Sequence, residues 1–397
     1  MEVKYMVKVV SFVLLLSILF VKNTISQDII EGTNGYVTYE QGTLPIVISV
    51  PHGGSLMPAD IPDRTCNDPV YFMDANTIEV ANALNAALFE ATGCYPHIIY
   101  SYLHRRKLDC NRNLTDGACG NAQAMTAWNE FHDFIAQAQA TANNDWDDNI
   151  FFVDLHGHGN EQQRIELGYL LYEEELEESD AVLNTSTFIS YSTIQNLVAS
   201  NLENQSHAQL LRGPQSMGSL LAAEGYPSVP SAEIPAPGIG SNYFSGGYIV
   251  ANHTCYQDEL TTNGVQVELN FDGIRDTESN RQLFATRFAA VILNYLDIHR
   301  GVDASSCSSL NSLESIIEET EFSIFPNPVP TGLRVLHVEG FNSKEAQIEL
   351  RDSFGRLVQI YNNLSSELIL PNQLASGVYY LVLRDDQNFS SNRIIVY

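Results

Sequence analysis

The chain has 397 residues, of which 44% are hydrophobic, and it carries a formal net charge of -28. A chain of this length and apolar content can bury a large core and is long enough for two or three domains, which excludes an intrinsically disordered protein. The strong negative charge excludes nucleic acid and anionic membrane surfaces as expected partners.

Residues 1–26 have the layout of a secretory signal peptide, with lysines before an apolar run and cleavage predicted after Ser26. The apolar run covers about a dozen residues, fewer than the roughly 20 that span a membrane. We therefore expect an exported mature chain without a transmembrane segment. Export permits disulfides, and Cys110 with Cys119 is the most local candidate pair among the six cysteines.

Residues 27–300 alternate apolar β-rich runs with helical patterns. The runs at 45–50 and 149–155 are mostly apolar without strict alternation, as in strands that are covered on both faces. Apolar residues recur at helical spacing over 74–93 and again over 281–299. This alternation predicts an α/β domain with a mixed, mostly parallel sheet and flanking helices.

The sequence changes in character after residue 300. A polar segment at 301–320 is a predicted linker, and residues 321–397 contain only short strand patterns separated by turn residues. This pattern predicts a small all-β sandwich.

The predicted sandwich resembles the C-terminal sorting domain of the type IX secretion system of Bacteroidetes. The matching features are FPNPVPTG at 325–332, LRDSFGRLV at 350–358 and LASGVYYLVLR at 374–384. The resemblance implies passage through the periplasm, contact with the type IX secretion machinery, and a secreted or cell-surface location. The alternative is a generic sandwich that binds carbohydrate or a protein partner.

Two apolar strands of the α/β domain end in the same way, with histidine followed by glycine. The first runs into His52 and the second into His156. Sites in open α/β sheets form at the carboxyl ends of strands, so we expect these two side chains to lie close together. Two neutral imidazoles suit a metal ion, and zinc is the metal expected in an exported hydrolase. Strand alternation places Asp154 on the side of His156, where it can orient that ligand. His158, beyond the first glycine after His156, is expected to have a supporting or solvent-facing role and not to bind the metal.

A catalytic zinc takes three protein ligands and a water, so a carboxylate should complete the set. Glu79, in the first turn of the helix over 74–93, is the favoured candidate, and Asp74 just ahead of the helix is the alternative. Asn76 and Glu79 also fit a reciprocal helix cap, which would use the same carboxylate for another purpose.

Glu268 is the candidate general base. In the segment 264–270 apolar residues alternate with Gln266, Glu268 and Asn270, so Glu268 lies among polar neighbours on a strand that otherwise belongs to the core. Such a carboxylate can take a proton from water and return it to the leaving amine. The alternative is an exposed glutamate on an edge strand.

The basic segment HRRKLDCNR at 104–112 is a candidate binding site for a substrate carboxylate. Arginine grips a carboxylate with two parallel hydrogen bonds, which favours Arg112 together with Asn111. Arg106 is a candidate for stabilising the oxyanion. For Arg105 and Lys107, a structural salt bridge to Asp109 or to surface acids is the favoured role.

In this order, the motifs resemble the N-formylglutamate amidohydrolase family, which is distantly related in fold to zinc carboxypeptidases and to acylamino-acid deacylases of the aspartoacylase type. The resemblance covers about residues 44–296. It rests on SVPHGG, DANTIE, RRKLDCNR, VDLHGHG, YFSGGY and VQVELN. The chain departs from the carboxypeptidase pattern His-x-x-Glu, because residue 55 is serine.

The resemblance implies a phosphorylase/hydrolase-like, zinc-carboxypeptidase-like fold and one zinc ion. Carried over by motif position, the ligands are His52, Glu79 and His156, the base is Glu268, and the carboxylate clamp is Asn111 with Arg112. The implied function is a secreted zinc-dependent amidohydrolase that cleaves a formyl-type N-acyl amide of an amino acid with a free carboxylate.

Two alternatives stay open at this point. One is a metallocarboxypeptidase or γ-glutamyl hydrolase with the same zinc centre, acting on a small molecule or peptide. The other is a non-catalytic surface binding protein. Export itself argues for a substrate other than formylglutamate, because the breakdown of formylglutamate from histidine is an intracellular process.

Overall fold

The computed structural model describes residues 27–303 except Asp258, together with most strands of the C-terminal segment. The described parts of that segment are 323–325, 327, 329–330, 335–339, 347–352, 357–361, 367–371, 374, 377–384 and 389–396. The predicted signal peptide and the predicted linker after residue 303 lie outside the described residues.

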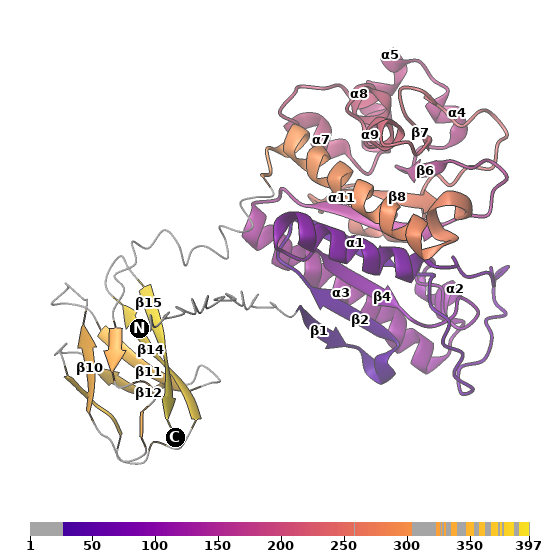
Figure 1. The fold of residues 1–397 in the computed structure, drawn as a ribbon. Helices are drawn as coiled ribbons and strands as arrows, with labels where there is room; N and C mark the ends of the chain where they lie inside the picture. The colour runs from indigo at the N-terminus through magenta and orange to yellow at the C-terminus, as the bar shows by residue number, and fades with distance from the viewer. Residues whose placement is uncertain are drawn as a thin grey trace, which may run out of the picture.

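An eight-stranded mixed sheet forms the centre of residues 27–303 (Figure 1), in the order β1-β2-β4-β3-β5-β8-β6-β7. Its strands are β1 (Asp28–Glu31), β2 (Val37–Gln41), β3 (Ile46–Val50), β4 (His97–Ser101), β5 (Phe151–Gly157), β6 (Ile165–Gly168), β7 (Ser228–Val229) and β8 (Asn263–Leu269). The central strands β4, β3, β5 and β8 run parallel, while β2 and β6 flank them antiparallel. The predicted mixed sheet is confirmed.

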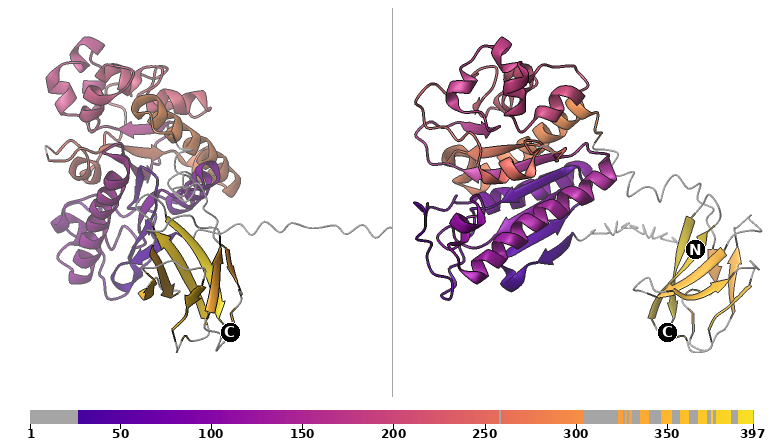
Figure 2. Two further views of the ribbon diagram at one scale, coloured as in Figure 1. Left: turned by 90° about the vertical axis from the view of Figure 1, so that its left-hand side faces the viewer. Right: turned by 180° about the vertical axis from the view of Figure 1, so that it is seen from behind.

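Helices cover both faces of this sheet. They are α1 (Thr77–Thr92), α2 (Leu114–Ala118), α3 (Ala122–Trp146), α4 (Glu173–Leu176), α5 (Asp180–Leu183), α6 (Ser186–Ser190), α7 (Gln195–Ser200), α8 (His207–Arg212), α9 (Met217–Ala223), α10 (Tyr248–His253) and α11 (Glu278–Arg300), with short helical turns at Thr33–Gly35 and Phe271–Arg275. Figures 1 and 2 show α1 and α11 on one face and α3 on the other. No helix in the described part of the chain is long and apolar enough to cross a membrane.

The mostly apolar run of β3 is explained by this layering. Ile46, Ile48 and Val50 enter the core beneath α1 and α11, whereas Val47 enters the core beneath α3. Because side chains alternate between the two faces of a strand, a strand covered on both faces is apolar at most positions. The one polar residue of β3, Ser49, is buried and donates to Asp154 at 2.6 Å.

The C-terminal segment is all β. Its strands are β9 (Ser323–Phe325), β10 (Val335–Glu339), β11 (Gln347–Asp352), β12 (Leu357–Tyr361), β13 (Glu367–Ile369), β14 (Gly377–Arg384) and β15 (Phe389–Val396). They form two antiparallel sheets, β13-β10-β9 and β12-β11-β14-β15. Leu336 of the first sheet and Leu350 and Leu381 of the second share one buried cluster.

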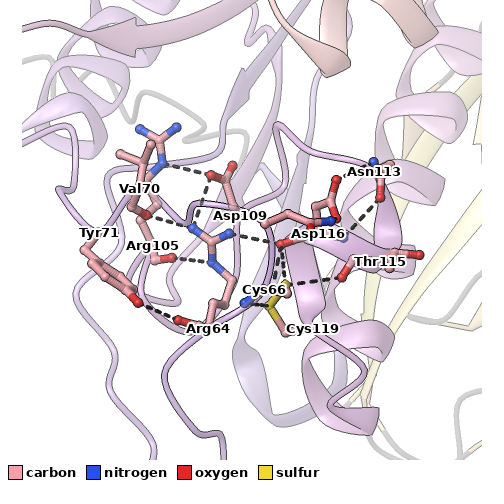
Figure 3. The surroundings of a disulfide bond; sticks show 11 residues. Arg64, Cys66, Val70, Tyr71, Arg105, Asp109, Asn113, Thr115, Asp116 and Cys119 are labelled. Carbon is pink, nitrogen blue, oxygen red and sulfur yellow. Dashed lines mark hydrogen bonds and ion pairs between the residues drawn. A yellow bond between two sulfur atoms is a disulfide. The ribbon is translucent and has the colours of Figure 1, made fainter.

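The disulfide of Cys119 differs from the predicted pair. Cys119 is bonded to Cys66, 53 residues away, with a Cα–Cα distance of 5.7 Å (Figure 3). Cys110 is a free thiol buried in the core beneath α3. The prediction of Cys110 with Cys119 is wrong, because the chain between these two cysteines turns one thiol into the core and the other toward the loop that carries Cys66.

We expect the double substitution Cys66→Ser, Cys119→Ser to lower the free energy of unfolding of the α/β domain. A cross-link over 53 residues contributes about 4 kcal/mol by restricting the unfolded chain. Urea unfolding followed by tryptophan fluorescence measures this loss of stability in the α/β domain alone, because Trp128 and Trp146 both lie in α3. Cys110→Ala is the matched control that leaves the cross-link intact. Equal midpoints for wild type and the double variant under oxidising conditions contradict the expectation.

His97 gives the α/β domain a pH-dependent stability. It is buried, its Nδ1 accepts hydrogen bonds from Tyr39 and from the backbone N–H of Gly42, and burial lowers its pKa to about 4. The unfolded chain binds a proton near pH 6.5. This contribution is therefore complete above pH 6.5 and is lost below it, by up to about 1.4 kcal/mol per pH unit. His97→Gln should show a smaller loss between pH 6.5 and 5 in the same urea experiment. An unchanged slope contradicts the assignment.

Candidate metal centre

His52 and His156 meet at one edge of the sheet. His52 follows β3, and His156 lies near the end of β5, which pairs with β3 in parallel. The imidazole centroids are 4.8 Å apart, and both rings are buried. The structure therefore brings together the two histidines that the strand ends predict. His158 is not part of this group, and its Nε2 donates to the carbonyl of Arg164 at 2.8 Å.

Asp74 completes a group of three with these histidines. Its Oδ2 lies 3.4 Å from Nδ1 of His52 and 3.2 Å from Nδ1 of His156. One ligand atom from each residue lies within 4.8 Å of the others, and all three residues are buried. Two imidazole nitrogens and one carboxylate are a donor set of catalytic zinc sites. We call His52, Asp74 and His156 the candidate metal centre.

Glu79, the carboxylate that the sequence favours as the third ligand, does not meet the histidines. The buried face of α1 carries Val80 and Ala81, and Glu79 is turned outward to an exposed position. There it lines a cavity of about 600 Å³ between α1 and α11. Asp74 lies in the loop before the helix, where its backbone N–H donates to the carbonyl of His52 at 3.0 Å. Asp74 therefore replaces Glu79, because the rotational phase of α1 turns Glu79 outward while the backbone contact with His52 holds the loop of Asp74 at the histidines.

A buried carboxylate orients each histidine. Oδ1 of Asp109 lies 2.7 Å from Nε2 of His52, and Oδ2 of Asp154 lies 2.9 Å from Nε2 of His156. Because a carboxylate only accepts, each Nε2 donates, and Nδ1 of both rings is left facing Asp74. The sequence predicts this role for Asp154, which shares a face of β5 with His156, but predicts Asp109 only as a salt-bridge partner.

The residues of the candidate metal centre fit a divalent cation. Nδ1 of His52 is buried and has no hydrogen-bond partner among the described residues. Burial lowers the pKa of His156, but the neighbouring Asp154 and Asp74 outweigh burial and raise it well above its ordinary value. Burial likewise raises the pKa of Asp74, yet the two imidazoles hold it well below its usual range. The surroundings thus stabilise positive charge between two imidazole nitrogens and a carboxylate, as a zinc ion requires.

Glu268 lies beside the candidate metal centre. It stands opposite His156 in the parallel pairing of β5 and β8, with Oε1 3.9 Å from Nδ1 of His156. The same oxygen accepts a hydrogen bond from Nε2 of Gln266 at 3.0 Å. Only 4% of Glu268 is exposed, which rules out the exposed edge-strand alternative. Burial raises the pKa of Glu268 to about 8 against the opposing charge of His156.

Two of the three predicted substrate-binding residues adjoin the site or lie near it. Nδ2 of Asn111 lies 3.5 Å from Nε2 of His156 and donates to Oε1 of Gln266 at 3.3 Å. Arg112 is half-buried. The pKa of the neighbouring Arg64 is lowered mainly by burial and to a smaller extent by the positive charge of Arg112. Asn111 and Arg112 therefore lie close enough to the candidate metal centre for a carboxylate clamp, and substrate binding by them stays a prediction.

Arg106 does not reach the candidate metal centre. Its side chain is 45% exposed, pairs with Asp63 at 3.4 Å and lies over the ring of Tyr71. Arg105 occupies the position expected for Arg106, with Nη1 3.6 Å from Oδ1 of Asp74. The predicted salt bridge of Arg105 to Asp109 is confirmed, at 3.0 Å from Nε.

Arg64 joins the disulfide region to the candidate metal centre (Figure 3). Its buried guanidinium donates to the carbonyls of Val70 at 2.7 Å and Asp116 at 3.0 Å, and its Nε donates to the carbonyl of Arg105 at 2.9 Å. It also lies 3.4 Å from Oδ2 of Asp109, the carboxylate that orients His52. One arginine therefore fixes the loop that leads to Asp74.

Arg275 joins three other segments of the site. Its guanidinium donates to the carbonyls of Ala75 at 2.6 Å, His158 at 2.7 Å and Asn270 at 3.4 Å. A side chain at Gly157 would place its Cβ 2.4 Å from the guanidinium carbon, so the close approach requires glycine. Arg275 thus ties the loop of Asp74 to the ends of β5 and β8.

Sequence reasoning missed these supporting residues for different reasons. Asp109 had a readable signal, since it stands two positions before Asn111 in the basic segment. Arg64 and Arg275 lie in segments without apolar periodicity, and their partners are backbone carbonyls that any residue supplies. No sequence pattern predicts those contacts.

Comparison with known proteins bears on the C-terminal segment. Residues 323–397 match the family described as the secretion system C-terminal sorting domain. The segment is a type IX sorting domain. The protein is therefore a type IX secreted protein of the cell surface or the medium, and its sorting domain implies an interaction with the secretion machinery.

The other comparisons add little. No curated protein matches the chain. A solved structure of PorZ, an essential bacterial surface component of the type-IX secretion system of Porphyromonas gingivalis, is 21% identical over 24% of this chain and 13% of that chain, with a TM-score of 0.18. This likeness is too small to bear on the fold. The resemblance of residues 44–296 to the amidohydrolase family stays a prediction.

We expect His156→Ala and Asp74→Asn to weaken zinc binding at least about a hundredfold, because each removes a ligand. Asp109→Asn, which removes an orienting acceptor, should weaken it about ten- to a hundredfold. Competition with a chromophoric chelator measures the affinity, and tryptophan fluorescence checks that each variant is folded. Glu79→Gln is the matched control and should bind zinc like wild type. Weaker binding by Glu79→Gln together with normal binding by Asp74→Asn contradicts the assignment.

Proposed function

We propose that the α/β domain is a secreted zinc-dependent amidohydrolase that cleaves an N-acyl, formyl-type amide of an amino acid with a free carboxylate. The observation that carries the proposal is the buried convergence of His52, Asp74 and His156, with Glu268 beside them. A purely structural ion-pair network does not need a free imidazole nitrogen at its centre, whereas a metal site does.

His52, Asp74 and His156 would hold the zinc ion. When bound, zinc polarises the substrate carbonyl and makes a water molecule nucleophilic at neutral pH. The protein's own residues supply the rigid frame for this chemistry. Each histidine is fixed by a carboxylate at Nε2, so that only Nδ1 is available as a ligand.

Glu268 is the proposed proton carrier. Its Oε1 is held by Gln266, and its place beside His156 puts the carboxylate next to the centre. In its ionised form, which a cation at the centre would favour, it would accept a proton from the attacking water and donate it to the departing amine nitrogen, so that it ends the cycle in its starting form.

Arg105 and Arg112 with Asn111 are the proposed contacts for the charged parts of the substrate. Arg105 is the cation nearest the centre, its side chain is 17% exposed, and it replaces Arg106 as the candidate for stabilising the developing negative charge. Arg112 and Asn111 are suited to a carboxylate because both carry donors in a planar arrangement.

We expect Glu268→Gln to keep its zinc and to lose turnover by about a hundred- to ten-thousandfold, because a proton carrier is removed while the ligands stay. Metal analysis and hydrolysis of N-formyl and N-acetyl amino acids measure the two quantities. Glu224→Gln is the matched control, because Glu224 is a surface residue paired with Arg287. Unimpaired turnover by Glu268→Gln removes this residue from the mechanism.

Product analysis in the same assay separates the proposed function from the other readings. A released acid with a free amino acid supports the amidohydrolase, and loss of the C-terminal residue from a peptide supports a carboxypeptidase. If no divalent metal copurifies and chelators change no activity, the metalloenzyme proposal fails.

A further inference from the structure

Three phenylalanines of residues 27–303 are exposed, namely Phe72 at 85%, Phe244 at 42% and Phe271 at 39%. All the other phenylalanines of this region are buried or half-buried. Exposed apolar residues are ordinary when they are scattered, but a set of large aromatic side chains around one site indicates a binding surface. Each of these three lies on a segment that contacts residues next to the candidate metal centre.

Phe72 lies two residues before Asp74 in a loop that is held on both sides of it. The hydroxyl of Tyr71 donates to the carbonyl of Arg64 at 2.8 Å, and the backbone N–H of Asp74 donates to the carbonyl of His52 at 3.0 Å. The backbone at Phe72 is thus fixed while its ring extends into solvent.

Phe244 is hydrogen-bonded to β6, the strand that pairs with the Glu268 strand β8. Its backbone N–H donates to Oε2 of the fully buried Glu166 at 3.0 Å, and Glu166 stands opposite Glu268 in the pairing of β6 and β8. The ring of Phe244 lies 6.2 Å from the imidazole of His158. The hydroxyl of Tyr243 holds the same loop, donating to a carbonyl of β6 at 2.6 Å.

Phe271 follows the end of β8, the strand that carries Glu268. The guanidinium of Arg275 lies 5.4 Å from the centroid of its ring. Since Arg275 also donates to the carbonyls of Ala75 and His158, it ties Phe271 to the loop of Asp74 and to the loop that Phe244 contacts. The three phenylalanines therefore belong to three loops that meet around one centre.

We propose that Phe72, Phe244 and Phe271 form an apolar rim that binds an aromatic or branched apolar group of the substrate. This inference rests on the proposed function and narrows its substrate class. The centre itself offers the cation Arg105 and the amide of Asn111, so it suits the polar end of the substrate. The rim adds an apolar requirement that formylglutamate does not meet. The substrate class is an N-acyl or peptidyl amino acid that carries a free carboxylate and an apolar group next to the scissile amide.

The experiment compares kcat/KM for N-acetylphenylalanine, N-benzoylglycine, N-acetylglutamate and N-formylglutamate with the full zinc-loaded chain. The two aromatic compounds place the ring on the amino-acid side or on the acyl side of the amide, so their order shows which side the rim contacts. We expect the better aromatic substrate to exceed the polar ones about tenfold or more. In the triple variant Phe72→Ala, Phe244→Ala, Phe271→Ala this ratio should fall toward one, mainly through KM.

Tyr191→Ala is the matched control for loss of an exposed aromatic residue. Tyr191 is 45% exposed and lies near Thr193, whose carbonyl accepts from Gly264 at the opposite end of β8. It should keep the wild-type ratio. The inference is overturned if the polar compounds are the better substrates, or if the triple variant keeps the wild-type preference.

A binding measurement separates failure of the rim from failure of the proposed function. Calorimetry with the zinc-loaded Glu268→Gln chain compares the affinities for N-acetylphenylalanine, N-benzoylglycine and N-acetylglutamate, without and with the triple substitution. The rim is supported if an aromatic compound binds more tightly than N-acetylglutamate and the triple substitution abolishes this difference. This holds even when no compound is hydrolysed, because absence of hydrolysis counts only against the proposed amidohydrolase activity. Equal affinities for all compounds in both backgrounds overturn the rim.

Discussion

The pairing of two buried imidazoles with buried carboxylates is the interaction on which the rest of the site depends. Removing a carboxylate from water costs several kcal/mol unless charged or hydrogen-bonding partners replace the water. Asp109 and Asp154 are fully buried, and His52 and His156 are their partners at Nε2. This requirement fixes the tautomer of both rings, and the fixed tautomers turn both Nδ1 atoms toward Asp74. The geometry of the candidate metal centre thus follows from the need to satisfy the carboxylates behind it.

The features that the sequence predicted are those that follow from the geometry of strands. Parallel strands end at one edge of a sheet, which brings His52 and His156 together. Side chains alternate along a strand, which puts Asp154 on the side of His156 and places Gln266 with Glu268 on one face. Both rules operate within a strand or between adjacent strands, so a correct assignment of β3, β5 and β8 was sufficient to apply them.

The features that the sequence did not predict depend on loops and on the rotation of a helix about its axis. Glu79 is turned away from the histidines by the phase of α1, whereas Asp74 reaches them through the path of the loop before the helix. Arg105 and Arg106 are adjacent, so their side chains leave the loop in different directions, and only the path of the loop shows that Arg105 reaches Asp74 while Arg106 pairs with Asp63. The disulfide partner of Cys119 likewise depends on a loop, because Cys66 lies 53 residues away in sequence and only the fold brings it close.

The loop that carries Asp74, the third residue of the candidate metal centre, links the site to the disulfide and so to export. Residues 51–76 contain no helix and no strand beyond a single bridge at Leu56, yet they supply His52 and Asp74. A segment of this length without regular structure has few backbone contacts to define it and must be held by other means. Arg64 and the disulfide of Cys66 supply two of these contacts. Because a disulfide persists in an oxidising compartment, secretion is compatible with a loop that depends on this cross-link to hold Asp74 in place.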